Sequence, residues 1–145
     1  MSTLKPHLNF IVLCKNLSHG NGTPTDLIGV FNRMALKNSG GTGALVEFAI
    51  AVSLRIEDFS RSYKLIIRIK NPDGSEMESG SDWVGGHNGQ KITWATYPVT
   101  WKVSRVGTYW FKVYLDDELL GQAPMDVVVA SSRNIDDDTQ WPLFV

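Results

Sequence analysis

The segment from residue 107 to residue 129 carries the pattern that most constrains how this chain can fold. Between Gly107 and Leu115 apolar and more polar side chains alternate, and a polar tip, Asp116-Asp117-Glu118, separates this run from a second one that ends at Val129. The side chains on the more apolar side of the first run are Tyr109, Phe111, Val113 and Leu115. Alternation with a period of two residues around a short polar turn is typical of paired antiparallel strands with one buried face. The segment therefore predicts a β-hairpin and an all-β fold.

Six earlier segments show strand-like patterns of apolar residues. They lie at residues 7–15, 26–36, 45–56, 63–70, 75–79 and 91–103. Residues 45–56 also fit a helix, since they are rich in Ala and place Phe48, Val52 and Ile56 four residues apart, but their alternation and β-branched content favour a strand. With the hairpin, these segments give about eight short strands and no convincing helix, which predicts a β-sandwich.

Glycine, proline and polar clusters indicate where these strands bend or end. The polar run at residues 16–25 breaks the pattern between the first two strands. Gly29 predicts a bulge or a close approach of the backbone, and Pro98 either divides its strand or lies at a sheet edge, because proline has no N–H to donate. Residues 71–74, Asn-Pro-Asp-Gly, predict a tight turn. The first strand is apolar on both of its faces, which predicts burial from both sides.

The hairpin also resembles part of a known fold. Residues 106–111 have the Gly-x-Tyr-x-Phe form found near the end of immunoglobulin-like and fibronectin-like domains, and residues 119–127 continue that pattern. Together with residues 10–14 and 27–32, the hairpin is similar to small, uncharacterised bacterial proteins built as a single β-sandwich. The resemblance implies an antiparallel immunoglobulin-like β-sandwich of about eight strands, and it implies no activity. The chain departs from antibody domains in lacking paired cysteines, and its hairpin tip has Asp116-Asp117 where Asp-Gly or Asn-Gly is usual.

The bulk composition predicts one domain. With 145 residues, of which 43% are hydrophobic, the chain suits a single sandwich over residues 1–130, followed by a C-terminal extension at residues 131–145 that packs on its own or a neighbouring subunit. The single cysteine, Cys14, favours a reducing compartment over a disulfide scaffold. Because no apolar run approaches the roughly 20 residues of a membrane helix, and the start resembles no signal peptide, we expect a cytoplasmic protein with no membrane partner.

The charge balance argues against nucleic acid as a partner. The chain has 14 basic and 15 acidic side chains, whereas nucleic-acid-binding domains carry a clear basic excess or patch. A basic group on the middle strands is interspersed with acidic residues and fits a solvated sheet face. Its members are Arg55, Arg61, Lys64, Arg68 and Lys70.

Residues that could form a metal site or a catalytic site are scattered. His7, His19 and His87 lie far apart, and Cys14 falls in an apolar strand, so no zinc-binding spacing occurs. Residues 40–43 are glycine-rich but lack the Lys of a phosphate-binding loop, and residues 136–138 lack the alternating spacing of a calcium loop. We therefore expect no cofactor, no metal, no catalytic residue and no enzymatic activity.

The aromatic residues offer a better candidate site. Trp110 lies opposite Tyr109 and Phe111, so it points outward if those point inward, and Tyr114 shares its side. An outward pair of this kind serves as a carbohydrate platform or a protein interface, unless another strand or the tail covers it. The pattern leaves open whether Trp83, Trp94 and Trp101 are buried or face a ligand.

The apolar C-terminus completes the predicted surface. Trp141, Leu143 and Phe144 follow an acidic turn and are expected to fold back on the sandwich or to pack on a neighbouring subunit, as in a homodimer. The leading hypothesis is a non-enzymatic binding or assembly module that acts through protein–protein contacts of Trp110, Tyr114 and this tail. The alternatives are a carbohydrate- or small-ligand-binding module that uses exposed tryptophans, and an enzyme whose site combines loop carboxylates with His87.

Overall fold

Every regular element of the described chain is a β-strand. The computed structural model describes residues 5–20, 23–36, 44–58, 60–85, 92–103, 105–129 and 143–144. The strands are β1 (His7–Gly20), β2 (Thr23–Phe31), β3 (Arg33–Leu36), β4 (Ala44–Arg55), β5 (Ser62–Lys70), β6 (Glu76–Gly85), β7 (Ile92–Val103), β8 (Gly107–Leu115), β9 (Glu118–Val129) and β10 (Leu143–Phe144). The prediction of an all-β fold is confirmed, and the helical alternative for residues 45–56 is wrong.

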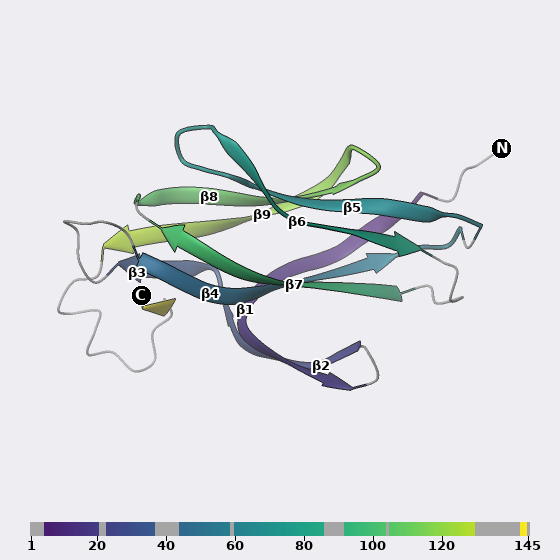
Figure 1. The fold of residues 1–145 in the computed structure, drawn as a ribbon, viewed down its shortest axis with the longest axis horizontal. Helices are drawn as coiled ribbons and strands as arrows, with labels where there is room; N and C mark the ends of the chain where they lie inside the picture. Colours follow the sequence, from purple (N-terminus) through teal and green to yellow (C-terminus); the bar gives the residue numbers. More distant parts are fainter. Residues whose placement is uncertain are drawn as a thin grey trace.

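The strands form two sheets that pack face to face (Figure 1). The four-stranded sheet has the order β2-β1-β4-β7, and the six-stranded sheet has the order β10-β3-β9-β8-β5-β6. The predicted hairpin is present as β8 and β9, paired antiparallel. Two pairings at one edge of the six-stranded sheet are parallel, those of β3 with β9 and of β10 with β3.

Two predicted boundaries near the start of the chain are wrong. The segment predicted as one strand over residues 26–36 is two strands, because the chain passes from one sheet to the other at Asn32, whose carbonyl accepts the N–H of Asp126 at 3.0 Å. The polar run at residues 16–25 does not break the pattern, since β1 continues to Gly20 and pairs with β2. Backbone pairing between the two strands, such as Leu17 with Leu27, sustains the ladder where the side chains are polar.

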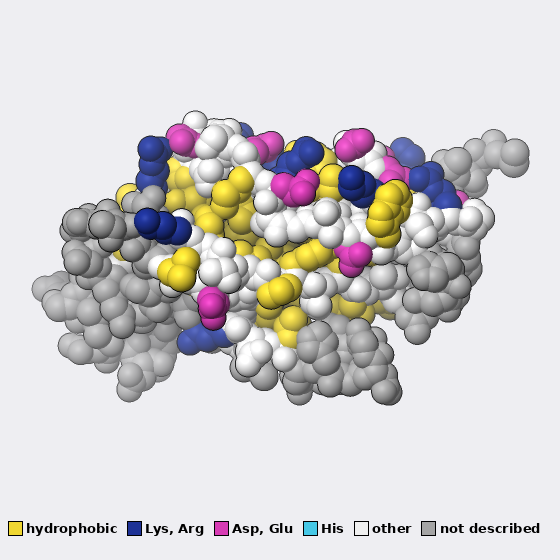
Figure 2. Space-filling model, in the orientation of Figure 1, with side chains coloured by type: hydrophobic (Ala, Val, Ile, Leu, Met, Phe, Trp, Pro, Cys, Tyr) yellow, Lys and Arg dark blue, Asp and Glu magenta, His cyan; other side chains and the backbone are white. Residues whose placement is uncertain are grey.

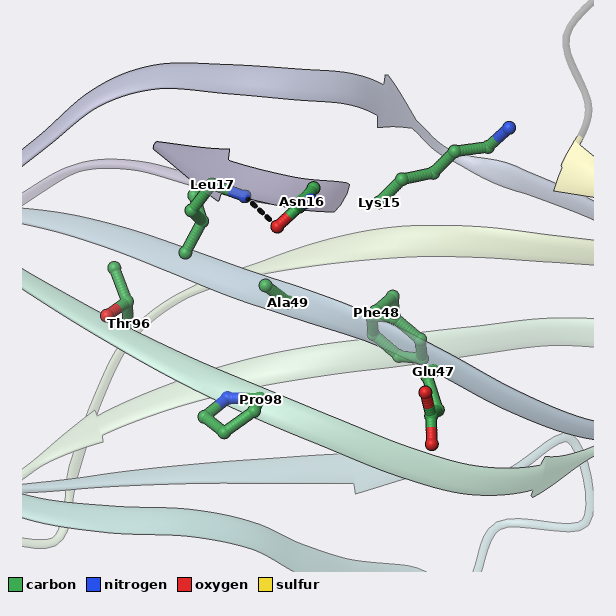
Figure 3. A pocket seen from close by; sticks show the side chains of 8 residues that line it. All are labelled: Lys15, Asn16, Leu17, Glu47, Phe48, Ala49, Thr96 and Pro98. Atoms are coloured by element: carbon green, nitrogen blue, oxygen red, sulfur yellow. Dashed lines mark hydrogen bonds between the residues drawn. The ribbon is translucent and has the colours of Figure 1, made fainter. Parts of the chain in front are cut away.

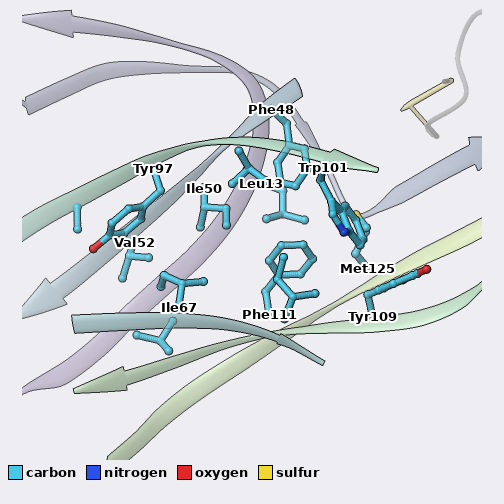
Figure 4. Packing of buried hydrophobic residues seen from close by; sticks show 14 of the residues in the cluster. Leu13, Phe48, Ile50, Val52, Ile67, Tyr97, Trp101, Tyr109, Phe111 and Met125 are labelled. Atoms are coloured by element: carbon cyan, nitrogen blue, oxygen red, sulfur yellow. The ribbon is translucent and has the colours of Figure 1, made fainter. Parts of the chain in front are cut away.

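The core consists of the inward side chains of both sheets, and it contains a cluster of aromatic rings (Figure 4). The ring of Phe48 meets those of Phe31, Phe111 and Trp101 edge to face, with centroids 5.6, 6.0 and 6.2 Å apart. Trp101 also meets Tyr109 at 4.8 Å. Such pairs add to the apolar area that the rings bury, so the aromatic cluster joins β4 and β7 of one sheet to β8 of the other.

The strand order and one corner identify the sandwich as immunoglobulin-like. The N-terminal part of the chain contributes strands to both sheets, since β1 and β2 join one sheet and β3 joins the other. At the start of β8 the hydroxyl of Tyr109 donates to the carbonyl of Arg105 at 2.9 Å. This is the tyrosine corner of immunoglobulin-like folds. The fold implied by the Gly-x-Tyr-x-Phe resemblance is confirmed.

The unusual hairpin tip has a structural explanation. Asp116 and Asp117 have positive φ angles of 47° and 67°, as a two-residue turn of the primed type requires. Asp116 accepts the N–H of Lys64 at 2.9 Å, donates its own N–H to the Lys64 carbonyl at 2.9 Å, and pairs with Arg61. These contacts with β5 compensate for a backbone conformation that glycine adopts more easily.

Candidate functional site

The predicted pair Trp110 and Tyr114 lies on the outer face of the six-stranded sheet, and both side chains are half-buried. Charged residues of neighbouring strands share this face. The Arg68 guanidinium lies 4.9 Å from the centre of the Tyr114 ring, and Lys112 pairs with Glu76 at 2.8 Å. In Figure 2 the Lys, Arg, Asp and Glu side chains gather along this sheet, at the top of the view. This face therefore carries the polar, solvated character usual for the outside of an antiparallel sheet.

The predicted tail residues occupy a different part of the same sheet. Leu143 and Phe144 form β10, whose backbone pairs in parallel with Met34 and Ala35 of β3. Two strands, β3 and β9, lie between β10 and the strand that carries Trp110. The structure thus does not bring Leu143 and Phe144 next to Trp110, and Trp141 lies outside the described residues.

The tryptophans that the sequence left open fall into three environments. Trp101 is 7% exposed and belongs to the aromatic core. Trp83 is 65% exposed on β6. Trp94 is half-buried on the outer face of the four-stranded sheet, where it meets Phe10.

The outer face of the four-stranded sheet lacks charge across its centre. We call this surface the apolar face and define it by nine outward side chains. They are Phe10 and Val12 of β1, Val30 of β2, Ala49, Ala51 and Ser53 of β4, and Trp94, Thr96 and Pro98 of β7. Phe10 remains 38% exposed and Val30 43% exposed. The solvated face of an antiparallel sheet normally carries polar side chains. The apolar composition of this face is instead typical of a surface that contacts another molecule.

Phe10 and Trp94 form the centre of the apolar face. Both pair in register with Ser53, from opposite sides of β4, and their rings meet edge to face at 5.1 Å. Ser53 is only 2% exposed, and its hydroxyl accepts the Asn9 side-chain N–H at 3.2 Å. The register of three strands therefore builds one aromatic ridge from residues that are far apart in the sequence.

A cleft continues the apolar face beneath a projecting hairpin. β1 pairs with β4 only as far as Cys14 opposite Ala49, and residues 15–20 then leave the sheet with residues 23–29 of β2. We call this two-stranded projection the arm (Figure 1). Between the arm and β4 and β7 lies a cavity of about 580 Å³ (Figure 3). Its lining residues are Lys15, Asn16, Leu17, Glu47, Phe48, Ala49, Thr96 and Pro98.

The base of the arm explains the glycine singled out in the sequence. Gly29 has a positive φ of 69°, and a Cβ atom there would lie 3.0 Å from the Lys15 side chain. The prediction of a bulge or a close approach at this position is confirmed. Gly29 thus lets the stem of Lys15 lie against β2 at the mouth of the cleft.

The candidate metal and catalytic residues do not form a site within the described residues. No group of three or more His, Cys, Asp or Glu side chains there is placed to hold a metal ion. Cys14 is buried, and its burial raises the pKa of the thiol, so it remains neutral. His87, residues 40–43, residues 136–138 and the side chain of His19 lie outside the described part. Among the described residues, no helix has the length and apolar character needed to cross a membrane.

The sequence contained one signal for the apolar face. Leu13 lies in the core and Ile11 packs against it, whereas Phe10 and Val12 point to the other side of the sheet. β1 is therefore apolar on both sides, as its sequence pattern indicated. The contributions of β4 and β7 carried no such signal, because Ala49, Ala51 and Trp94 are also common at other positions in strands.

Comparison with known proteins yields one family and several distant folds. A family model described as a family of unknown function (DUF6941) matches residues 9–128. No curated protein matches the chain. One solved structure with a similar chain path is that of the alkylpurine DNA glycosylase AlkC of Pseudomonas fluorescens, bound to DNA containing an abasic site analog. The two chains are 9% identical, and the TM-score is 0.48 over 87% of this chain and 31% of that chain. The present chain therefore spans about a third of that enzyme.

Two smaller proteins match over nearly their whole length. A CARDB domain from Pyrococcus furiosus, solved in complex with di-metal ions, has 13% identity and a TM-score of 0.42 over 90% of this chain and 100% of that chain. An immunoglobulin-like protein from Pseudomonas aeruginosa has 13% identity and a TM-score of 0.38 over 85% of this chain and 96% of that chain.

Proposed function

The chain belongs to the family of unknown function DUF6941, and because membership assigns no reaction, we propose from the geometry that the protein is a non-enzymatic binding module whose apolar face docks another protein. The uncharged centre of that face is the observation that carries the proposal. Its nine side chains include no Lys, Arg, Asp or Glu, and two of them, Phe10 and Trp94, form the aromatic ridge. Phe10, Val30 and Pro98 of this face are exposed, and apolar side chains exposed together on a soluble domain mark an interaction site.

The chemistry of the ridge suits a protein partner. Aromatic side chains at the centre of an interface supply most of its binding energy, and smaller neighbours exclude water around them. Phe10 and Trp94 fit the first role, and Val12, Val30 and Pro98 fit the second. A stable interface buries about 800 Å² on each partner, so a partner needs to cover the ridge together with the neighbouring cleft or arm.

The face around Trp110 and Tyr114, with the tail residues Leu143 and Phe144, remains a second surface for the same kind of contact. Arg68 lies over Tyr114 there, and Lys112 is paired with Glu76. A partner would have to displace or match these charges, which costs desolvation energy. The apolar face imposes no such cost, so we favour it.

Matched substitutions on the two outer faces test the proposal. We expect Phe10→Ser and Trp94→Ser to reduce recovery of co-purifying protein from the native cell at least tenfold, whereas Trp110→Ser leaves it unchanged. Sedimentation of the purified wild type and variants shows whether the partner is a second copy of the chain. Equal recovery with Phe10→Ser, Trp94→Ser and wild type, all equally folded by circular dichroism, would refute a role for the apolar face.

A further inference from the structure

One stretch of β4 has a backbone edge that no described strand covers. β4 pairs with β7 along its whole length, from Ala44 to Arg55. It pairs with β1 only from Ala49 to Arg55, because β1 departs into the arm after Cys14. Residues 44–48 therefore have a strand on one side and, within the described residues, the cleft on the other.

A sulfur contact shows which backbone groups point toward that cleft. The Cys14 thiol lies 3.7 Å from the carbonyl oxygen of Ala49, so this carbonyl points toward β1. Backbone N–H and C=O groups alternate between the two sides of a strand with a period of two. The N–H and C=O groups of Glu47 and Leu45 therefore point to the same side as those of Ala49, where β1 has left. Those of Val46 and Phe48 point to β7.

The same geometry explains why the outer edge of β7 is closed to a continuous new strand. Pro98 lies opposite Ala49 in the β4–β7 register. Because the backbone groups of Ala49 point to β1, those of Pro98 point away from β4, to the outer edge of β7. The N–H that proline lacks would therefore lie at this outer edge, and the hydrogen bonds between β4 and β7 are unaffected. A proline in the middle of a free edge prevents a continuous strand from adding there. The segment 44–48 contains no proline.

We propose that an extended segment of a partner protein adds as a strand to residues 44–48 of β4, beneath the arm. The inference rests on the proposed protein-binding role and specifies how the partner is held. Leu45 and Glu47 offer N–H donors and C=O acceptors that only an extended backbone satisfies in register. Five residues of strand span about 17 Å, and the cavity of about 580 Å³ gives such a segment room.

The walls of the cleft define the side chains that the segment carries. Ala49, Pro98 and Leu17 form an apolar part that accepts a small or aliphatic side chain. Lys15 and Glu47 also line the cleft, both are exposed, and neither belongs to an ion pair among the described residues. A segment with an apolar residue between an acidic and a basic one therefore matches the cleft.

A proline substitution separates backbone pairing from side-chain contact. The probe is a phage-displayed library of random dodecapeptides, selected on the immobilised full chain, with the selected peptides synthesised and measured by fluorescence anisotropy. Glu47→Pro removes the N–H that points to the cleft and leaves the ladder with β7 intact. Glu47→Ala, the matched control, removes the carboxylate and keeps the N–H. We expect Glu47→Pro to weaken peptide binding at least tenfold and Glu47→Ala to weaken it by less than threefold.

Hydrogen exchange on the wild type supplies a second measurement that needs no variant. In the free protein the amides of Leu45 and Glu47 should exchange rapidly, while those of Val46 and Phe48 are protected, and the selected peptide should protect all four. Protection of Leu45 and Glu47 before peptide is added would overturn the inference, because the chain itself or a second copy then occupies the edge. Failure to select any peptide, or equal binding by Glu47→Pro and wild type, would also overturn it. Selected peptides that lose affinity with Trp94→Ser and not with Glu47→Pro would sustain the proposed function and remove this mode of binding.

Discussion

Two buried tyrosines provide a matched test of the hydrogen bonds in this structure. Tyr109 is 4% exposed, and its hydroxyl donates to the Arg105 carbonyl at 2.9 Å. Tyr97 is 8% exposed, and its buried hydroxyl has no hydrogen-bond partner among the described residues. Replacing each by Phe removes the same oxygen atom from the same kind of side chain. The two variants therefore differ chiefly in whether a hydrogen bond is lost.

The expected magnitudes follow from that difference. An intramolecular hydrogen bond contributes about 1 kcal/mol net, and the exposed Arg105 can pair its carbonyl with water after the change. We therefore expect Tyr109→Phe to lower the free energy of unfolding by about 1 kcal/mol, with the ring still packed on Trp101. Tyr97→Phe loses no bond and removes a desolvated hydroxyl, so it should leave stability unchanged or raise it by up to about 1 kcal/mol.

Urea unfolding followed by tryptophan fluorescence measures both variants. The midpoint should fall for Tyr109→Phe and stay or rise for Tyr97→Phe, at an unchanged slope with denaturant. In a thermal scan a loss of 1 kcal/mol corresponds to a decrease of about 3–4 °C in Tm for a domain of this size. If the two variants lose equal stability, the hydroxyl of Tyr97 is bonded in solution and the reasoning from partner geometry is wrong.

Three further predictions test the core, the hairpin tip and the pH dependence. Burial, with a smaller contribution from Asp82, raises the pKa of Tyr97 above its ordinary value of 10. Ionisation of Tyr97 therefore costs no stability below pH 10 and lowers the stability of the fold as the pH rises further. Alkaline unfolding should be shallower for Tyr97→Phe, and identical profiles would contradict this. Phe111→Ala removes a fully buried ring that meets Phe48 and Trp101 and should cost about 3–5 kcal/mol in urea unfolding; a loss below 1 kcal/mol would show that the aromatic cluster is not packed as described. Asp117→Gly relieves a positive φ of 67° and should raise the free energy of unfolding by about 0.5 kcal/mol. Asp116→Gly should lower it by about 1 kcal/mol, because this variant loses the hydrogen bond from the Lys64 N–H and the ion pair with Arg61. A higher Tm for Asp116→Gly than for Asp117→Gly would disprove the stabilising role of Asp116.

The sequence predicts those features of the fold that depend on a few consecutive residues, such as the hairpin of β8 and β9. The alternation in β8 and β9 identifies Tyr109 and Phe111 as buried, because the period of a strand is a property of a few consecutive residues. The change of sheet at Asn32 has no such signature. It depends on the pairing of β3 with β9, some 90 residues further along the chain, and a single sequence carries no record of that pairing.

The candidate site illustrates the same limit. The outward direction of Trp110, Lys112 and Tyr114 was predictable from their own strand. The charges that meet them come from other strands, Arg68 from β5 and Glu76 from β6, so the character of the whole face was not predictable. Phe10 and Trp94 are separated by 84 positions in the sequence and meet only because both pair in register with Ser53. An aromatic ridge built in this way becomes visible only when the register of three strands is known.

Along β4 and β7 of the four-stranded sheet, the free strand edges are short or interrupted. A long free edge templates the addition of strand after strand, which is the usual route to aggregation. Here Pro98 interrupts the outer edge of β7, and the uncovered edge of β4 is limited to residues 44–48 by Cys14 at one end and by the start of the strand at the other. An added strand of that length satisfies Leu45 and Glu47 and then meets β1 where it pairs with Ala49. The contact with β1 limits how far such a strand extends along β4, and the apolar face lies beside it. We therefore expect a partner to supply both an extended segment for residues 44–48 and an apolar surface for the apolar face.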